Sequence, residues 1–216
     1  MAWFTRVTRF GDTHLVYGQE ANMSCGIASL MMCVFKLNKL KPGKTAITVE
    51  QDIYKKYEAA MGGVKYQPNQ VGTYGDKLAT ILTSLTSGTW RWHTTPPNSV
   101  ISTLIDKVGV DPGIGPVVDV EPVILGVDWD LGGAHWVVVD TIRDVFGTRY
   151  ATICDPWDAN VHIQKIKDTG PFYYDASSGG FNVNFWGTKP KGTLMGMKYD
   201  NSSKGQVKTW GMIYRD

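Results

Sequence analysis

The pattern of hydrophobic residues changes about halfway along the chain, and this change constrains the fold more than any other feature. In the first half, hydrophobic side chains recur every three or four residues, as on the buried face of a helix. After Gly115, runs rich in Val, Ile, Thr and Tyr replace that spacing and are typical of β-strands. Helices followed by strands favour an α+β fold. We expect a helical part over about residues 1–112 and a β part over about 113–216.

The local signals place four helices and five strands within these two parts. The predicted helices begin near Ser24, at Thr48 with a capping-box pattern, at Tyr74 and after Pro97-Asn98, and they end before Pro42-Gly43, at Gly62-Gly63, at Leu85 and at Gly109. The predicted strands cover residues 90–94, 116–127, 135–142, 150–154 and 206–214. The chain contains no internal repeat, and we expect one domain over residues 1–216.

Composition and charge exclude several classes of protein. The 216 residues include 43% hydrophobic and 19% charged residues, which is the profile of a globular protein and not of a disordered one. A net charge of +2, without a run of like charges, does not predict binding to nucleic acid or to membranes. No apolar segment is long enough for a transmembrane helix, and the N-terminus lacks the apolar region of a secretory signal. We expect a cytoplasmic protein, or one exported without a cleaved N-terminal signal.

Cys25 stands at the predicted start of the first helix. Unpaired backbone N–H groups and the positive end of the helix dipole favour a thiolate at such a position. The thiolate is the reactive form of cysteine, so Cys25 is a candidate nucleophile. Cys33 lies in the apolar part of the same predicted helix, and we expect it to be inert. Three cysteines with no Cys-x-x-Cys pair predict neither a disulfide framework nor a structural zinc site.

His135 begins a predicted strand directly after a Gly-Gly loop, where its side chain can face a cleft. If residues 135–142 and 149–155 form a hairpin centred near residue 145, His135 faces Asp155, and the two side chains share one face. The carboxylate would then orient the imidazole. A shift of one residue would separate the pair, and sequence alone does not fix the register. In this arrangement Cys154 points to the opposite face and is buried.

Gln19, six residues before Cys25, completes a constellation of four candidate catalytic residues. A side-chain amide at this position can donate a hydrogen bond to a developing oxyanion, together with the backbone N–H of the nucleophile. Each of these residues alone is more often structural than catalytic. Together they provide nucleophile, base, orienting carboxylate and oxyanion donor, which is the set that covalent acyl transfer requires.

Three segments of the chain resemble the papain-like cysteine peptidase superfamily: Gln19-Glu-Ala-Asn-Met-Ser-Cys25-Gly-Ile-Ala-Ser-Leu-Met, Ala134-His-Trp-Val-Val-Val and Ile153-Cys-Asp155-Pro. They are most similar to its compact bacterial branch, which includes the double-glycine leader peptidases of bacteriocin exporters and papain-like effector proteases. The likeness is confined to about 25 residues. Plant and lysosomal members carry Cys-Gly-Ser-Cys-Trp around the nucleophile and an Asn as the third residue, whereas this chain has Asn-Met-Ser-Cys-Gly and Asp155.

The resemblance implies a helical subdomain that carries Cys25, packed on an antiparallel sheet that carries His135 and Asp155. It implies hydrolysis of peptide bonds in a peptide or protein substrate, with Gln19 as oxyanion donor and without a cofactor. Papain-like folds also support other chemistry. A cell-wall amidase, an isopeptidase, a transamidase and a non-catalytic binding module rich in aromatic residues are therefore kept as alternatives.

Several other residues have weaker claims to a role. Trp136 and Trp157 flank the proposed pair, and they are either walls of the site or ordinary core aromatics. No carboxylate partner can be assigned from sequence to the remaining histidines, which we interpret as structural or surface residues: His14, His93 and His162. Acidic residues are frequent between positions 128 and 158, but their spacing is not that of an EF-hand, so no metal site is predicted: Asp128, Asp130, Asp140, Asp144 and Asp158.

Overall fold

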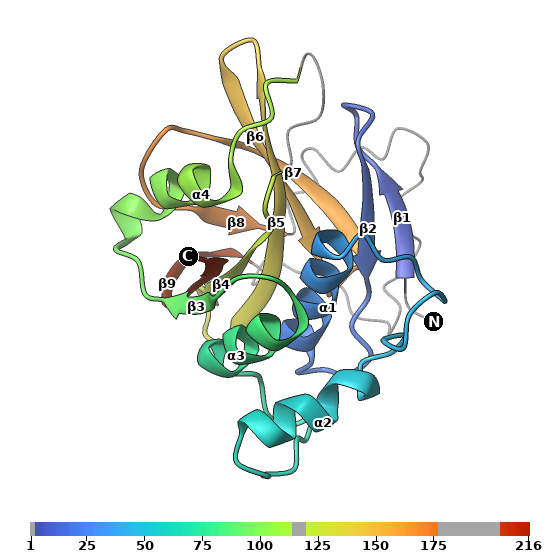
Figure 1. Cartoon of the computed structure of the whole chain (residues 1–216). Helices are drawn as coiled ribbons and strands as arrows, with labels where there is room; N and C mark the ends of the chain where they lie inside the picture. Colours follow the sequence, from blue (N-terminus) through green and yellow to red (C-terminus); the bar gives the residue numbers. More distant parts are fainter. Residues whose placement is uncertain (1–2, 114–119, 177–203) are drawn as a thin grey trace.

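The computed structural model describes residues 3–113, 120–176 and 204–216, and these form an α+β fold (Figure 1). The helices are α1 (Cys25–Leu37), α2 (Gln51–Ala60), α3 (Gly75–Leu85) and α4 (Val100–Val108), with a 3-10 turn at Pro97–Ser99. The strands are β1 (Trp3–Val7), β2 (Thr13–Tyr17), β3 (Trp90–His93), β4 (Val123–Trp129), β5 (Ala134–Val145), β6 (Thr148–Asp155), β7 (Asn160–Ile166), β8 (Tyr173–Asp175) and β9 (Lys204–Arg215). The sequence-based expectation of an α+β fold with an antiparallel sheet is confirmed.

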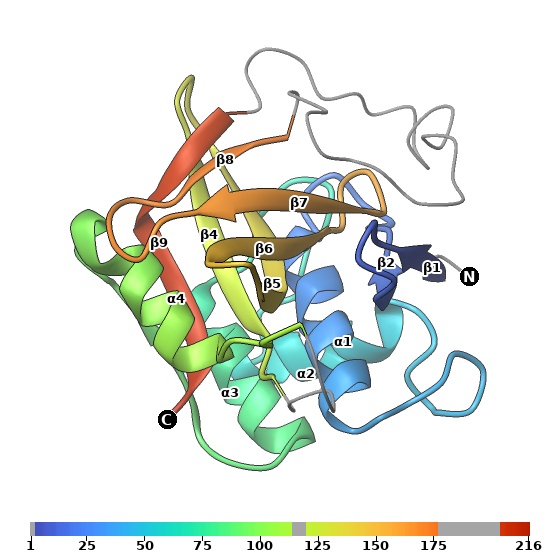
Figure 2. The same ribbon diagram turned by 90° about the horizontal axis from the view of Figure 1, so that it is seen from above.

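Seven strands form one antiparallel sheet in the order β3-β9-β4-β5-β6-β7, with β8 paired to one end of β9. Figure 2 shows the strong twist of the sheet from β9 to β7. Strands β1 and β2 form a separate hairpin. Figure 1 shows α1 between this hairpin and the sheet, with α4 on the other side of β5.

The two faces of the sheet belong to two hydrophobic cores. The first core contains α1 together with Trp136, Val138 and Cys154 from one face of the sheet. The second contains α4 together with Val137 and Ile153 from the other face. Because neighbouring residues of a strand point to opposite faces, the continuous buried runs of β5 and β6 serve both cores at once.

The first half of the chain is less purely helical than its sequence pattern predicts. Strands β1 and β2 lie within it in addition to the predicted strand β3, which crosses to the edge of the main sheet to pair with β9. The hairpin strands β1 and β2 are only five residues long, and four of the five β1 residues are only half-buried. Short, partly exposed strands carry little hydrophobic alternation, so β1, β2 and β8 were not predicted; the longer and mostly buried β7 was also missed.

Several predicted boundaries are wrong by three residues or more. Helix α1 ends at Leu37, well before the predicted stop at Pro42-Gly43, and β5 continues to Val145 beyond the predicted Ile142. Helix α2 begins at Gln51 and not at Thr48, because the Asp52 carboxylate accepts hydrogen bonds from the backbone N–H groups of Thr48 (2.6 Å) and Val49 (3.0 Å) and folds that segment into a turn. Strand β4 begins at Val123, whereas the prediction began at residue 116; residues 116–119 lie outside the described part of the chain. Among the described helices, none has the length and apolar character needed to cross a bilayer.

Candidate active site

Cys25 is the first residue of α1, as the sequence predicts, and its side chain is almost completely buried. Gly26 lets the start of the helix pack closely against Trp136 of β5 and against Thr73. A Cβ atom at Gly26 would lie 1.9 Å from Thr73 Oγ1 and 2.9 Å from Trp136 Cδ1. The Cys25 thiol is close enough to the imidazole of His135 to contribute to the raised pKa of that ring.

His135 is the second residue of β5 and is buried between the thiol and a carboxylate. Its Nε2 lies 2.8 Å from Asp155 Oδ1, and the Cys25 thiol also acts on the imidazole. The order thiol, imidazole, carboxylate is that of a nucleophile, its base and the residue that fixes the tautomer of the base.

Asp155 ends β6 and is fully buried. Its Oδ1 also accepts a hydrogen bond from the Trp157 backbone N–H at 2.8 Å, and its Oδ2 accepts one from the Tyr174 hydroxyl at 2.6 Å. Burial opposes ionisation, but the charge and hydrogen bond of His135, the nearby His162 and the Tyr174 bond outweigh it and hold the pKa of Asp155 well below its usual value. Tyr174 was not identified from the sequence, because it lies in the unpredicted strand β8.

The carboxylate in turn controls the charge of the imidazole. Burial disfavours imidazolium, yet the Asp155 charge and the hydrogen bonds with Asp155 and Cys25 more than compensate and raise the pKa of His135 above its usual 6.5. A cation at this position is the charge that stabilises a thiolate on a neighbouring cysteine. The electrostatics therefore suit a thiolate–imidazolium pair.

The pair of His135 and Asp155 was predicted correctly, but the predicted strand register is wrong. Val138 pairs with Cys154, so continuing the register by one residue places Asp155 opposite Val137, two residues from His135. The ion pair therefore runs diagonally across the strands, within the reach of a long side chain. Cys154 is buried on the opposite face, as predicted.

A β-bulge at Asp140 keeps the pair on one face. Near the turn, Thr141 pairs with Thr152, and extending that register would place Asp155 opposite Val138, on the face away from His135. The pairing shifts by one residue between Val139 and Thr141, which restores the shared face. Asp140 is held by His14 Nδ1 at 2.6 Å and by Lys36 Nζ at 3.1 Å. His14 thus has a carboxylate partner that the sequence did not reveal, and the same holds for His162 with Asp158 (3.0 Å).

Aromatic rings surround the imidazole. Trp129 stacks on His135 with ring centroids 5.6 Å apart, and Trp157 meets it edge-on at 6.1 Å. Trp136 points to the opposite face, where it is buried in the first core and donates a hydrogen bond to Thr73 O (3.2 Å). Trp157 therefore walls the site and Trp136 does not, while the role of Trp129 was missed.

Gln19 is buried beside the site, with its backbone N–H bound to Pro156 O at 2.9 Å. That bond ties the segment before the nucleophile to the segment after Asp155. The side-chain Nε2 donates to the carbonyls of Ala21 (2.8 Å) and Asn22 (3.2 Å). An amide hydrogen of Gln19 would have to leave one of these carbonyls in order to reach an oxyanion.

Two groups of described residues have ligand atoms close enough to share a metal ion: His14, Asp140 and Cys154, and Asp155, Asp158 and His162. In the first, the ammonium of Lys36 already neutralises Asp140. In the second, Asp155 is the orienting carboxylate of the candidate triad. The described acidic residues considered for calcium do not gather at one point.

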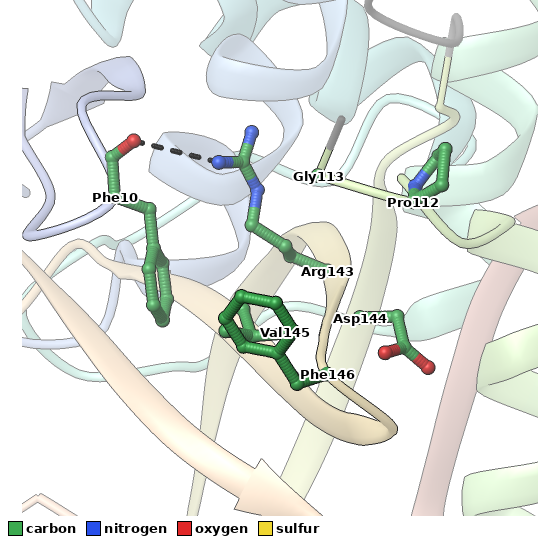
Figure 3. Close-up of a pocket in the computed structure, with 7 residues that line it drawn as sticks. All are labelled: Phe10, Pro112, Gly113, Arg143, Asp144, Val145 and Phe146. Atoms are coloured by element: carbon green, nitrogen blue, oxygen red, sulfur yellow. Dashed lines mark hydrogen bonds between the residues drawn. The ribbon is translucent and has the colours of Figure 1, made fainter. Parts of the chain in front are cut away.

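A separate pocket of about 210 Å³ lies at the far end of β5, at the tip of the β5–β6 hairpin (Figure 3). Phe10 and the exposed Phe146 form its apolar part. Arg143, on its wall, is held by Asp12 (2.6 Å) and Asp111 (2.8 Å). With about 3.3 Å per strand residue, eight residues separate this pocket from His135 by about 25 Å, so it is not part of the candidate active site.

No protein-family model matches the chain, and no curated protein matches its sequence. The candidate site therefore stands on its own geometry and chemistry.

Proposed function

We propose that this protein is a cysteine peptidase of the papain-like kind that hydrolyses peptide bonds. The observation that carries the proposal is the buried imidazole of His135, which lies 2.8 Å from the carboxylate of Asp155 and close enough to the Cys25 thiol for the two groups to interact. A nucleophilic helix N-terminus set against an antiparallel sheet with His and Asp supports the papain-like arrangement.

The proposed reaction begins with attack of the Cys25 thiolate on a peptide carbonyl. The backbone N–H of Cys25 and the Gln19 amide stabilise the oxyanion, and His135 protonates the leaving amine. Water, activated by His135, then releases the acyl group from the sulfur. Asp155 keeps the imidazole in the tautomer that these steps need.

The test combines thiol labelling with product analysis. We expect iodoacetamide to label Cys25 faster than Cys33 and Cys154 at pH 6, and the His135→Ala variant to lose this selectivity, because the imidazolium that favours the thiolate is gone. A proteome-derived peptide library should yield new N-termini with the wild type and none with Cys25→Ala. Cleavage by Cys25→Ala at the wild-type rate would refute the proposal, and products joined to an added amine would indicate acyl transfer instead of hydrolysis.

A further inference from the structure

The segment of residues 19–24 carries the candidate oxyanion donor and leads directly into the nucleophile, and one buried carboxylate holds it. Glu50 directly precedes α2 and is fully buried. Its Oε1 accepts hydrogen bonds from the Glu20 backbone N–H and from the Ser24 hydroxyl, both at 2.8 Å. Its Oε2 accepts one from the Tyr54 hydroxyl at 2.6 Å.

These bonds reach both ends of the segment. Ser24, which precedes Cys25, also accepts a hydrogen bond from the Ala21 backbone N–H at 3.1 Å. The carbonyl of Ala21 is in turn bound by the Gln19 amide. A chain of hydrogen bonds therefore connects Glu50 to Gln19 on one side and to the residue before the nucleophile on the other.

The surroundings of Glu50 shift its pKa to a value at which its charge changes near neutral pH. Burial raises the pKa of Glu50 to about 7, while the hydrogen bonds from Tyr54, Glu20 and Ser24 act in the opposite direction. The ionisable groups that face it are Glu20 in the same segment, Tyr17 of β2, Tyr54 of α2 and Tyr66 before α3. Cys25 and Glu50 both contribute to the raised pKa of Tyr66, whose hydroxyl donates a hydrogen bond to Met23 O at 2.9 Å. The same group of side chains therefore borders the nucleophile.

We propose that Glu50 is a positioning residue whose carboxylate fixes the 19–24 segment, and with it Cys25, and that protonation of Glu50 loosens this hold. A carboxylate only accepts hydrogen bonds, so it accommodates three donors at once. A carboxylic acid carries a proton of its own and must give up or reorient one of them. The inference rests on the proposed thiol chemistry.

The experiment measures the rate of Cys25 alkylation by iodoacetamide from pH 5 to 9, by peptide mass spectrometry. We expect the wild-type rate to contain a step near pH 7, added to the rise from thiol ionisation. Glu50→Gln should lose the step and react about tenfold more slowly at pH 8, because hydrogen bonds to a charged acceptor are lost. Tyr54→Phe should move the step to higher pH, because the Tyr54 bond lowers the pKa of Glu50.

The control is Asp106→Asn, which changes an exposed acid of α4 whose carboxylate lies 3.4 Å from Lys107 Nζ. Its profile should coincide with that of the wild type. A Glu50→Gln profile that also coincides, or a step that Tyr54→Phe does not move, would overturn the inference; the second variant decides the matter if Glu50→Gln does not fold. His135→Ala in the same series separates the two proposals, because an unchanged rate in that variant would instead overturn the triad.

Discussion

Asp155 shows how much a single residue contributes to the candidate site. Its carboxylate accepts hydrogen bonds from an imidazole, a backbone amide and a phenol, and it is fully buried. These donors favour its ionised form, and the ionised form in turn favours the imidazolium of His135. Asp155 therefore sets the charge of the imidazole beside the thiol, and it acts on Cys25 through His135.

Replacement of the Asp155 carboxylate by an amide tests whether Asp155 controls the charge of His135. In Asp155→Asn the pKa of His135 should fall, because the charge that raises it is removed. Alkylation of Cys25 at pH 6 should slow about tenfold or more, since each unit of pKa is a factor of ten. Asp168→Asn, which changes an exposed carboxylate that pairs with Arg149, is the control and should react like the wild type. Equal rates for Asp155→Asn and the wild type would show that Asp155 does not tune the site.

The residues that sequence predicted at this scale are those with unusual chemistry. Cys25, His135 and Asp155 were recognised from residue type and from their places at the starts and ends of elements. Tyr174 and Glu50 escaped because a tyrosine in a three-residue strand and a glutamate before a helix have no local signal. Their importance comes from partners 19 and 26 residues away.

At the scale of elements, the start of α1 depends on a contact that only glycine permits. A side chain at Gly26 would collide with Thr73 and Trp136, at the point where the helix meets β5. We expect Gly26→Ala to lower the free energy of unfolding by about 1–3 kcal/mol, measured by urea denaturation, and to slow Cys25 alkylation. Gly72→Ala is the matched control, because its Cβ atom meets nothing closer than Met23 Cε at 3.7 Å. Similar stabilities for the two variants would contradict this account.

The β-bulge at Asp140 is the second element-scale feature, and it joins the nucleophile helix to the strand of the base. Lys36 of α1 binds both the carboxylate and the backbone carbonyl of Asp140, while His14 binds the carboxylate from β2. This ion group holds the residue at which the register of β5 and β6 shifts.

Asp140→Asn should therefore affect both stability and reactivity. Loss of this partly buried charge leaves Lys36 and His14 without their anion, so we expect a loss of about 2 kcal/mol in chemical denaturation, with slower labelling of Cys25. Asp168→Asn removes the exposed Arg149–Asp168 ion pair of the neighbouring strand and should cost less than about 1 kcal/mol. An Asp140→Asn variant with unchanged labelling would mean that the bulge persists without its ion group.

For the whole molecule, buried Glu50 predicts a pH dependence of stability. Its pKa is about 7 in the folded protein and 4.5 by its ordinary value, so the folded state binds the proton more tightly. Wild-type stability should then fall as pH rises from about 4.5 to 7, and Glu50→Gln should lack this contribution. We expect the difference in unfolding free energy, variant minus wild type, to increase across that range in denaturation at several pH values. A constant difference would show that Glu50 titrates normally.

The sequence by itself determined the α+β class, the four helices, most strands of the main sheet and the chemical identity of the candidate triad. These follow from local information: hydrophobic period, turn residues, and the position of a cysteine or histidine at the end of an element. Tertiary structure alone decided the register of β5 and β6, the diagonal approach of His135 to Asp155, and the roles of Trp129, Tyr174 and Glu50. The physical reason is that a one-residue bulge reverses the faces of a strand without changing its hydrophobic pattern, since β5 and β6 are buried on both faces.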